Sequence, residues 1–146
     1  MNSLEFKASK KQMEALKYLM DDKTTEIGYW GAAWWGKSFI GVFWVWMMAK
    51  KYPWTRRFFW RKELTNLTKT TLASYYKFLQ IYNIPERDHG KLDWKNNVIR
   101  FPNWSEIYLL DLAYKPADPL YTRLGSMELT GGFVDESNIC KSRNLI

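Results

Sequence analysis

Apolar residues recur at helical spacing in three segments of the chain, and each segment predicts a helix. The first segment follows Ser9 and Gln12, which fit a capping box at a helix start. The second segment, residues 37–51, is apolar on nearly every side, which is typical of a buried helix. The third segment is residues 65–83, and its inward-facing residues are predicted to be Leu72, Tyr75, Tyr76 and Leu79.

Short runs rich in apolar and aromatic residues predict three strands, at residues 25–30, 57–61 and 132–135. Two further runs, 97–101 and 106–112, flank Asn103-Trp104 and predict a β-hairpin. Strands and helices therefore alternate along much of the chain. This order is typical of an α/β fold, so we expect a mainly parallel sheet flanked by helices.

Composition narrows the class of protein. The chain has 146 residues, the length of one ordinary domain, and its 47% hydrophobic and 25% charged residues are atypical of a disordered chain or a coiled coil. Its single cysteine excludes an internal disulfide. The longest apolar run, residues 39–49, is shorter than the roughly 18 residues that a membrane span needs, and the first residues do not resemble a secretory signal. We therefore expect a soluble, cytoplasmic protein without a membrane partner.

Positive charge is concentrated in the middle third of the chain. Residues 50–100 contain twelve Lys or Arg against four Asp or Glu, and the whole chain carries a net charge of +7. Six of these cations lie close together in the sequence, at Lys50, Lys51, Arg56, Arg57, Arg61 and Lys62. Two interpretations stay open: a surface that contacts a polyanion such as DNA, or an ordinary solvated basic face.

Residues 31–38 match the P-loop (Walker A) pattern G-x-x-x-x-G-K-[ST], between a predicted strand and an apolar helix. Such a loop wraps phosphates with its backbone N–H groups and directs a helix N-terminus at the anion. Lys37 would reach the β- and γ-phosphates, and the Ser38 hydroxyl would ligate Mg²⁺. The alternative is a strand-to-helix turn with an incidental lysine. The predicted nucleotide-binding residues are Gly31, Ala32, Ala33, Trp34, Trp35, Gly36, Lys37 and Ser38.

A pair of acidic residues, Asp135 and Glu136, follows the predicted strand near residues 132–135. In a P-loop enzyme the first carboxylate of such a pair (Walker B) holds Mg²⁺, here Asp135 acting through water. The second, Glu136, would orient or deprotonate the attacking water. Such a pair standing alone is more often surface charge. Its place about a hundred residues after the P-loop favours the catalytic interpretation.

With both motifs placed, the chain resembles the ATPase domain of the large terminase subunit of tailed bacteriophages, the motor that packages DNA into procapsids. The resemblance covers most of the chain and includes four further segments, at residues 10–12, 61–62, 103–107 and 124–130. It implies a P-loop NTPase fold of the RecA/ASCE type. It also implies hydrolysis of ATP with Mg²⁺, coupled to DNA translocation.

The resemblance further implies partners and site residues. Gln12 would lie near the adenine, and an arginine from a neighbouring subunit would stabilise the transition state. Arg123 is the first candidate for that arginine and Arg61 the second, although Arg123 also fits an ordinary loop arginine. The implied partners are double-stranded DNA, the portal protein, the small terminase subunit and further copies of the chain in a ring. The implied location is the procapsid portal in the cytoplasm of an infected host.

The acidic pair lies about ten residues before the end of the sequence. Residues 1–146 are therefore expected to form a partial, incomplete ATPase domain without the coupling motif or the nuclease domain of a large terminase subunit, and without nuclease activity. Two alternative functions stay open. One is a helicase-type P-loop ATPase, and the other is an inactive fragment that binds nucleotide or DNA.

Tryptophan is unusually abundant and glycine is scarce, with nine Trp against eight Gly. Trp34 and Trp35 lie in a loop that needs small residues, and Asn103-Trp104 stands where an Asn-Gly type I′ turn is expected. Our hypothesis is that UGA codons meaning glycine were translated as tryptophan at positions 30, 34, 35, 54, 60, 94 and 104. The alternative is a genuine aromatic surface for stacking bases. Under our hypothesis, the predicted activity belongs to the native gene product.

Overall fold

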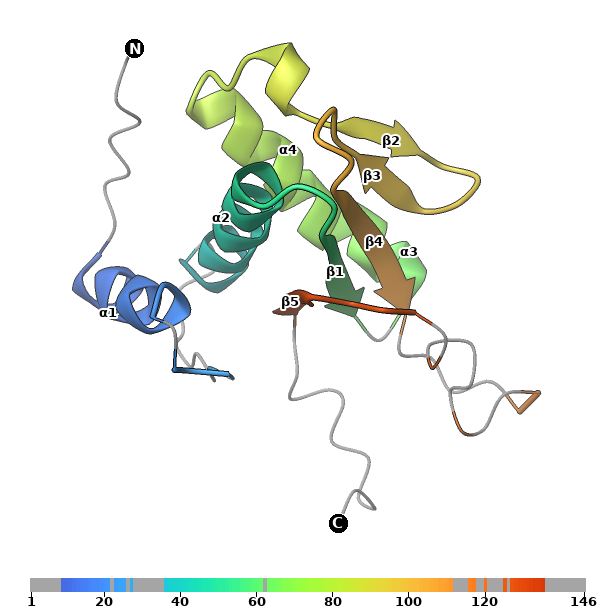
Figure 1. Cartoon of the computed structure of the whole chain (residues 1–146), viewed down its shortest axis with the longest axis horizontal. Helices are drawn as coiled ribbons and strands as arrows, with labels where there is room; N and C mark the ends of the chain where they lie inside the picture. The colour runs from blue at the N-terminus through green and yellow to red at the C-terminus, as the bar shows by residue number, and fades with distance from the viewer. Residues whose placement is uncertain are drawn as a thin grey trace.

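The computed structural model describes residues 9–21, 23–25, 27, 36–61, 63–111, 116–117, 120, 125 and 127–135. Their strands form one five-stranded mixed sheet packed against helices (Figure 1). The strand order is β2-β3-β4-β1-β5. The strands are β1 (Arg56–Arg61), β2 (Lys91–Asp93), β3 (Val98–Arg100), β4 (Glu106–Asp111) and β5 (Gly131–Val134).

The sheet is parallel on one side only. Strand β1 pairs in parallel with β4 and β5, whereas β3 pairs antiparallel with both β4 and β2. The expectation of a mainly parallel sheet is therefore only half right. Short turns join β2 to β3 and β3 to β4, and connections this short permit only antiparallel pairing. The predicted hairpin is confirmed, and the three-residue strand β2 was not predicted.

The helices begin close to their predicted starts. Helix α1 (Lys10–Leu19) has the expected capping box, in which the Gln12 amide donates to Ser9 Oγ and the Ser9 amide donates to Gln12 Oε1. Helix α2 (Gly36–Lys51) lies between α1 and the sheet (Figure 1), and Trp44 Nε1 donates to the Leu19 carbonyl at 3.2 Å. Among the described helices, none is long and apolar enough to cross a membrane.

The third predicted helix has an irregular middle. It consists of α3 (Leu64–Asn66), the π-helical turn η1 (Leu67–Thr71) and α4 (Leu72–Ile81). A short 3₁₀ turn, η2 (Glu86–Asp88), follows. The helical segment thus has nearly the predicted extent, but one turn of it is wider than an α-helix.

The core lies where α2 and α4 pack together against the sheet. Leu72, Tyr75 and Leu79 are buried as expected, but Tyr76 is 43% exposed, so its predicted inward position is wrong. The buried stripe of α4 is centred between Leu72 and Phe78, which places Tyr76 at its edge. Phe78 occupies the expected place instead, and its ring makes edge contacts with those of Phe39, Phe43 and Trp46.

The remaining predicted strand, residues 25–30, lies mostly outside the described residues. Thr25 and Ile27 are described, and neither belongs to a strand. The strand predicted near residues 132–135 is confirmed as β5, which begins one residue earlier and ends at Val134.

Two tryptophans adopt a backbone conformation that their side chains disfavour. Trp54 has φ +63° and Trp104 has φ +67°, in the left-handed region. Asn83 and Asn97 share this region, which asparagine tolerates far better than bulky residues do. Trp54 follows a proline at the third position of a turn, where positive φ normally requires glycine. The indole rings of Trp54 and Trp104 stack on each other with centroids 5.4 Å apart.

The turn at Trp104 differs from the expected two-residue type I′ turn. The Trp104 amide donates to the Phe101 carbonyl and the Phe101 amide donates to the Ser105 carbonyl, each at 3.0 Å. Three residues, 102–104, therefore lie between the hydrogen-bonded residues Phe101 and Ser105. In such a connection the third residue is left-handed and is usually glycine. The strand connection therefore still favours glycine at position 104. The reason is the left-handed third residue of this connection, and not the predicted type I′ turn.

Glycine at both left-handed positions should therefore stabilise the fold relative to alanine. Both double variants, W54G/W104G and W54A/W104A, lose the indole stack, so their difference isolates the backbone strain. We expect the glycine variant to be more stable by about 1–2 kcal/mol, after the entropy cost of glycine is subtracted. Urea unfolding measures this difference. Equal stability of the two variants would show that the left-handed backbone carries no such strain.

Candidate functional site

Two residues that are 97 positions apart in the sequence meet beyond the carboxyl end of strand β5. Ser38 lies in the first turn of α2, and Asp135 follows the last residue of β5. The Ser38 hydroxyl donates to Asp135, with Oγ 3.3 Å from each carboxylate oxygen. Asp135 is only 7% exposed. The end of the predicted P-loop and the first residue of the predicted acidic pair are therefore in direct contact.

This contact depends on a close approach between helix α2 and strand β5. Gly41 faces the ring of Phe133, and a Cβ on Gly41 would lie 2.4 Å from Phe133 Cδ2. Ser38 comes one helical turn before Gly41, and Asp135 comes two residues after Phe133. The absence of a side chain at position 41 therefore lets the hydroxyl of Ser38 reach the carboxylate.

Two further side chains contact the Asp135 carboxylate. Thr71 Oγ1 donates to Oδ2 at 2.8 Å, and Arg61 Nη1 forms an ion pair with the same oxygen at 3.4 Å. Arg61 Nη1 also donates to the hydroxyl of Thr70. Thr71 is fully buried and Arg61 is nearly so. The buried negative charge of Asp135 is thus compensated by a cation and two hydroxyl donors, as burial requires.

The donor set fits magnesium chemistry. A serine hydroxyl and an aspartate carboxylate are hard oxygen ligands of the kind that Mg²⁺ prefers. Within the described part of the chain, no three His, Cys, Asp or Glu residues cluster to form an all-protein metal site. Mg²⁺ rarely needs such a cluster, because substrate phosphates and water usually supply most of its ligands. Ser38 and Asp135 are therefore the residues that would hold the ion.

The other predicted site residues are placed unevenly. Gly36 and Lys37 form the start of α2. The remaining P-loop residues, 31–35, lie outside the described residues, as do Arg123 and Glu136. Gln12 is described, and its side chain closes the capping box of α1. The expected contact of Gln12 with adenine stays a prediction.

The structure gives Arg61 a different place from the one that the resemblance suggested. Arg61 ends strand β1, and its guanidinium is buried against Asp135 of its own chain. A side chain held in this way does not project toward a neighbouring subunit, so Arg61 is unsuitable as the arginine supplied in trans. Thr70 and Thr71 were not predicted as site residues. Their one sequence signal is the cluster of threonines, poor helix formers, inside a predicted helix.

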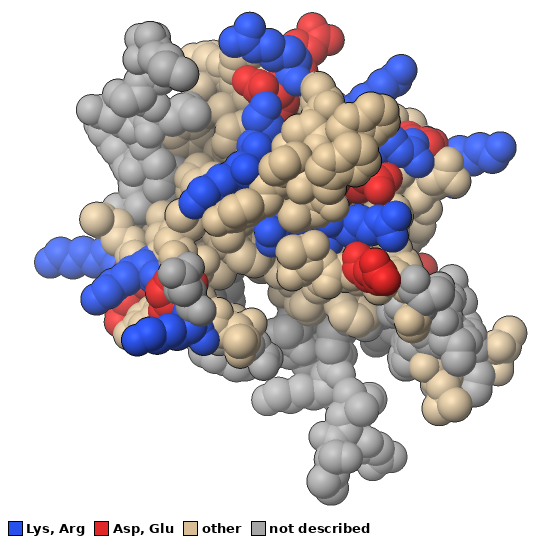
Figure 2. All heavy atoms as spheres, in the orientation of Figure 1, with Lys and Arg blue, Asp and Glu red and all other residues tan. Residues whose placement is uncertain are grey.

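The six cations that are clustered in the sequence differ in their surroundings. Two are buried, two pair with carboxylates, Lys51 is exposed, and Lys62 lies outside the described residues. The buried cations are Arg57 and Arg61, and the pairs are Lys50–Asp88 and Arg56–Glu106. Burial lowers the pKa of Arg57. Figure 2 shows acidic side chains next to basic ones on the face in view.

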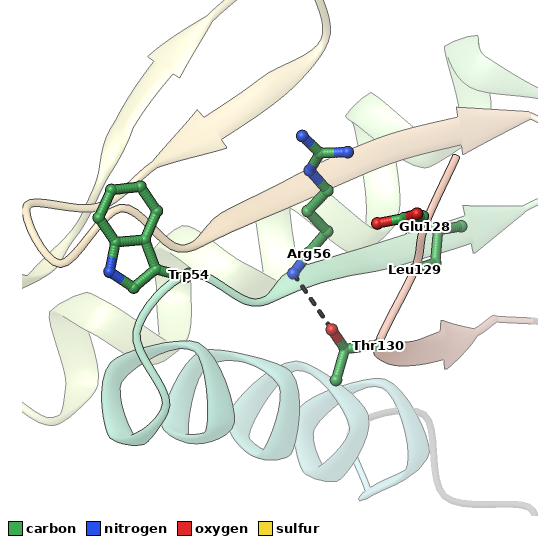
Figure 3. A pocket seen from close by; sticks show the side chains of 5 residues that line it. All are labelled: Trp54, Arg56, Glu128, Leu129 and Thr130. Atoms are coloured by element: carbon green, nitrogen blue, oxygen red, sulfur yellow. Dashed lines mark hydrogen bonds between the residues drawn. The ribbon is translucent and has the colours of Figure 1, made fainter. Parts of the chain in front are cut away.

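Two hollows among the described residues lie away from Asp135. Trp54, Arg56, Glu128, Leu129 and Thr130 line one of about 340 Å³ (Figure 3). In it the Arg56 amide donates to Thr130 Oγ1 at 3.3 Å. This hollow lies where β1 and β5 begin, whereas Asp135 follows the end of β5. A second hollow lies along the β2–β3 hairpin. Neither contributes to the candidate site.

Comparisons with protein-family models, with curated proteins and with solved structures find no match to this chain. The candidate site therefore rests on its own geometry and on the sequence motifs that it brings together.

Substituting Gly41 tests the packing that positions the site. In Gly41→Ala the new methyl group overlaps the Phe133 ring, which must move. We expect a net loss of about 1–2 kcal/mol in the free energy of unfolding, despite the better helix propensity of alanine. Gly125→Ala is the matched control, because a Cβ at position 125 meets no atom of the described residues within 4 Å. Urea unfolding of both variants measures the effect, and equal stability would contradict the tight approach of α2 to β5.

Proposed function

We propose that this chain is the P-loop ATPase domain of a DNA-packaging motor of the large-terminase type. One observation carries the proposal: Ser38 Oγ lies 3.3 Å from both carboxylate oxygens of Asp135. These are the two residues that a P-loop ATPase needs side by side to hold magnesium. They were selected from separate sequence motifs, so their contact is independent support for both motifs.

The position of the site within the fold also supports the proposal. In open α/β sheets, ligands bind beyond the carboxyl ends of the parallel strands. Asp135 directly follows β5 and Arg61 ends β1, and these two strands are parallel neighbours. Helix α2 directs its N-terminus, with Gly36, Lys37 and Ser38, to the same edge. A helix N-terminus favours an anion, as the phosphates of ATP require.

In the proposed reaction, each side chain of the site has a separate role. Lys37 would contact the β- and γ-phosphates, and Ser38 and Asp135 would hold Mg²⁺, Asp135 through water. When bound, Mg²⁺ would supply positive charge beside the phosphates. Glu136 orients the attacking water. Arg123 of a neighbouring subunit is proposed to stabilise the transition state.

The partners follow from the family resemblance. We propose ATP near Gln12, double-stranded DNA as the translocated substrate, and a ring of copies at the portal vertex, with the portal protein and the small terminase subunit as partners. The specific RecA/ASCE assignment is part of the same proposal. A helicase-type ATPase and a fragment that binds nucleotide or DNA without hydrolysis are the competing functions.

Nucleotide binding tests the proposal most simply in the chain with W34G and W35G, which restores a small P-loop. We expect this chain to bind a fluorescent ATP analogue with Mg²⁺. Lys37→Ala should weaken the binding about 10- to 100-fold, because it removes a charged ligand of the phosphates. Lys17→Ala, at an exposed position on α1, is the matched control and should bind as the parent does.

The outcomes separate the candidate functions. Hydrolysis that double-stranded DNA stimulates without separating its strands supports the packaging motor. Strand separation would instead identify a helicase, and binding without hydrolysis would identify the inactive fragment. Binding that is unchanged in Lys37→Ala would remove the P-loop from the proposed function altogether.

A further inference from the structure

The helix that faces Asp135 contains a π-helical turn at the point where it meets the site. The amide of Leu72 donates to the carbonyl of Leu67, five residues earlier, instead of four as in an α-helix. This turn, η1, lies between α3 and α4. π-Helical turns are rare, they insert one extra residue into a helix, and they occur often at functional sites.

The wider turn brings two consecutive threonines to the site. Thr71 Oγ1 donates to Asp135 Oδ2 at 2.8 Å, and the hydroxyl of Thr70 accepts a hydrogen bond from Arg61 Nη1. Adjacent residues of an α-helix point about 100° apart and do not ordinarily serve one site. Here Thr71 donates directly to Asp135 Oδ2, and Thr70 accepts a hydrogen bond from Arg61, which pairs with the same oxygen.

Burial of the Thr71 hydroxyl is unfavourable unless the hydroxyl forms a hydrogen bond. Thr71 is 0% exposed, and a buried hydroxyl without a partner costs several kcal/mol. Valine has nearly the same shape and would fill this position without a polar atom. The bond to Asp135 offsets the cost, and it fixes one oxygen of the carboxylate while Ser38 donates from the side of α2.

We propose that Thr71 is a positioning residue, which the π turn aims at Asp135 so that the carboxylate keeps the orientation needed to hold magnesium beside Ser38. This inference rests on the proposed function. Together, Thr71 and Arg61 hold Oδ2. Without the threonine donor, the carboxylate is free to rotate toward the guanidinium of Arg61 and away from Ser38.

The test is metal binding in the chain with W34G and W35G, with Mn²⁺ as the probe and a non-hydrolysable ATP analogue present. Electron paramagnetic resonance reports free Mn²⁺ and does not depend on turnover. We expect Thr71→Val to weaken Mn²⁺ binding about tenfold or more, as is usual when a residue supporting a metal ligand is lost. Thr71→Ser, which keeps the hydroxyl, should restore most of the affinity.

Thr68→Val is the matched control, since Thr68 lies in the same π turn but donates to the Thr65 carbonyl. Urea unfolding of each variant separates folding from binding. A Thr71→Val protein that is folded and binds Mn²⁺ like the parent would overturn the positioning role. A parent that binds neither Mn²⁺ nor the nucleotide analogue would instead overturn the proposed function itself.

A second inference has independent support in the backbone. We infer that seven tryptophans are glycine in the native protein, at positions 30, 34, 35, 54, 60, 94 and 104. Trp54 and Trp104 have positive φ and are 72% and 68% exposed, and Trp94 is exposed in the turn after β2. The indole nitrogen of Trp60 is buried without a hydrogen-bond partner among the described residues.

The two tryptophans outside this set behave differently. Trp44 Nε1 donates to the Leu19 carbonyl and Trp46 Nε1 donates to the Asp88 carbonyl. Trp46 is buried in the core and Trp44 is partly buried against it. Such hydrogen bonds are expected of genuine tryptophans that pack against a core. Among the six tryptophans that the structure describes, this contrast gives the same two groups as the sequence pattern does.

The gene sequence and the mass of the native protein test this inference. We expect TGA codons at the seven positions and TGG at codons 44 and 46. Tryptic peptides of the protein from its source should then show glycine masses at the seven positions. TGG at codon 54 or 104, or a tryptophan mass in the native peptides, would overturn the inference.

Discussion

The close approach of helix α2 to strand β5 is the constraint on which the site depends. Gly41 lets the helix backbone come against the ring of Phe133, and a Cβ there would overlap the ring. Since Ser38 and Asp135 lie close to this contact on their own elements, the packing of α2 against β5 sets the distance between them. The site is therefore preorganised by the core.

A buried aspartate at this position needs compensation, and the fold supplies it from three separate elements. Strand β1 contributes Arg61, the π turn contributes Thr71, and α2 contributes Ser38. The ion pair alone would not repay the removal of two charged groups from water. The additional hydroxyl donors offset part of this desolvation cost. They also connect the candidate metal site to the helical segment that covers it.

Sequence reasoning located most of the fold because local periodicity dictates it. The capping box at Ser9, the apolar helix α2 and the hairpin around Asn103 all follow from short patterns. Strand β2 was missed because three residues are too few to show an alternating pattern, and it is recognised as a strand only by its pairing with β3. Within the site, the P-loop and acidic-pair motifs indicated Ser38 and Asp135. The role of Thr71 depends on a π turn and a contact 64 residues away, which no local pattern encodes.

The central claim is that Ser38 and Asp135 act together on one magnesium–nucleotide complex. A double-mutant cycle on Ser38→Ala and Asp135→Asn tests it most directly, in the chain with glycine at positions 34 and 35. Calorimetric titration gives the part of the nucleotide-binding free energy that depends on Mg²⁺. The account predicts a coupling of about 1 kcal/mol or more, with the double variant little worse than either single one. Strictly additive losses, or no loss of the Mg²⁺-dependent part, would contradict it.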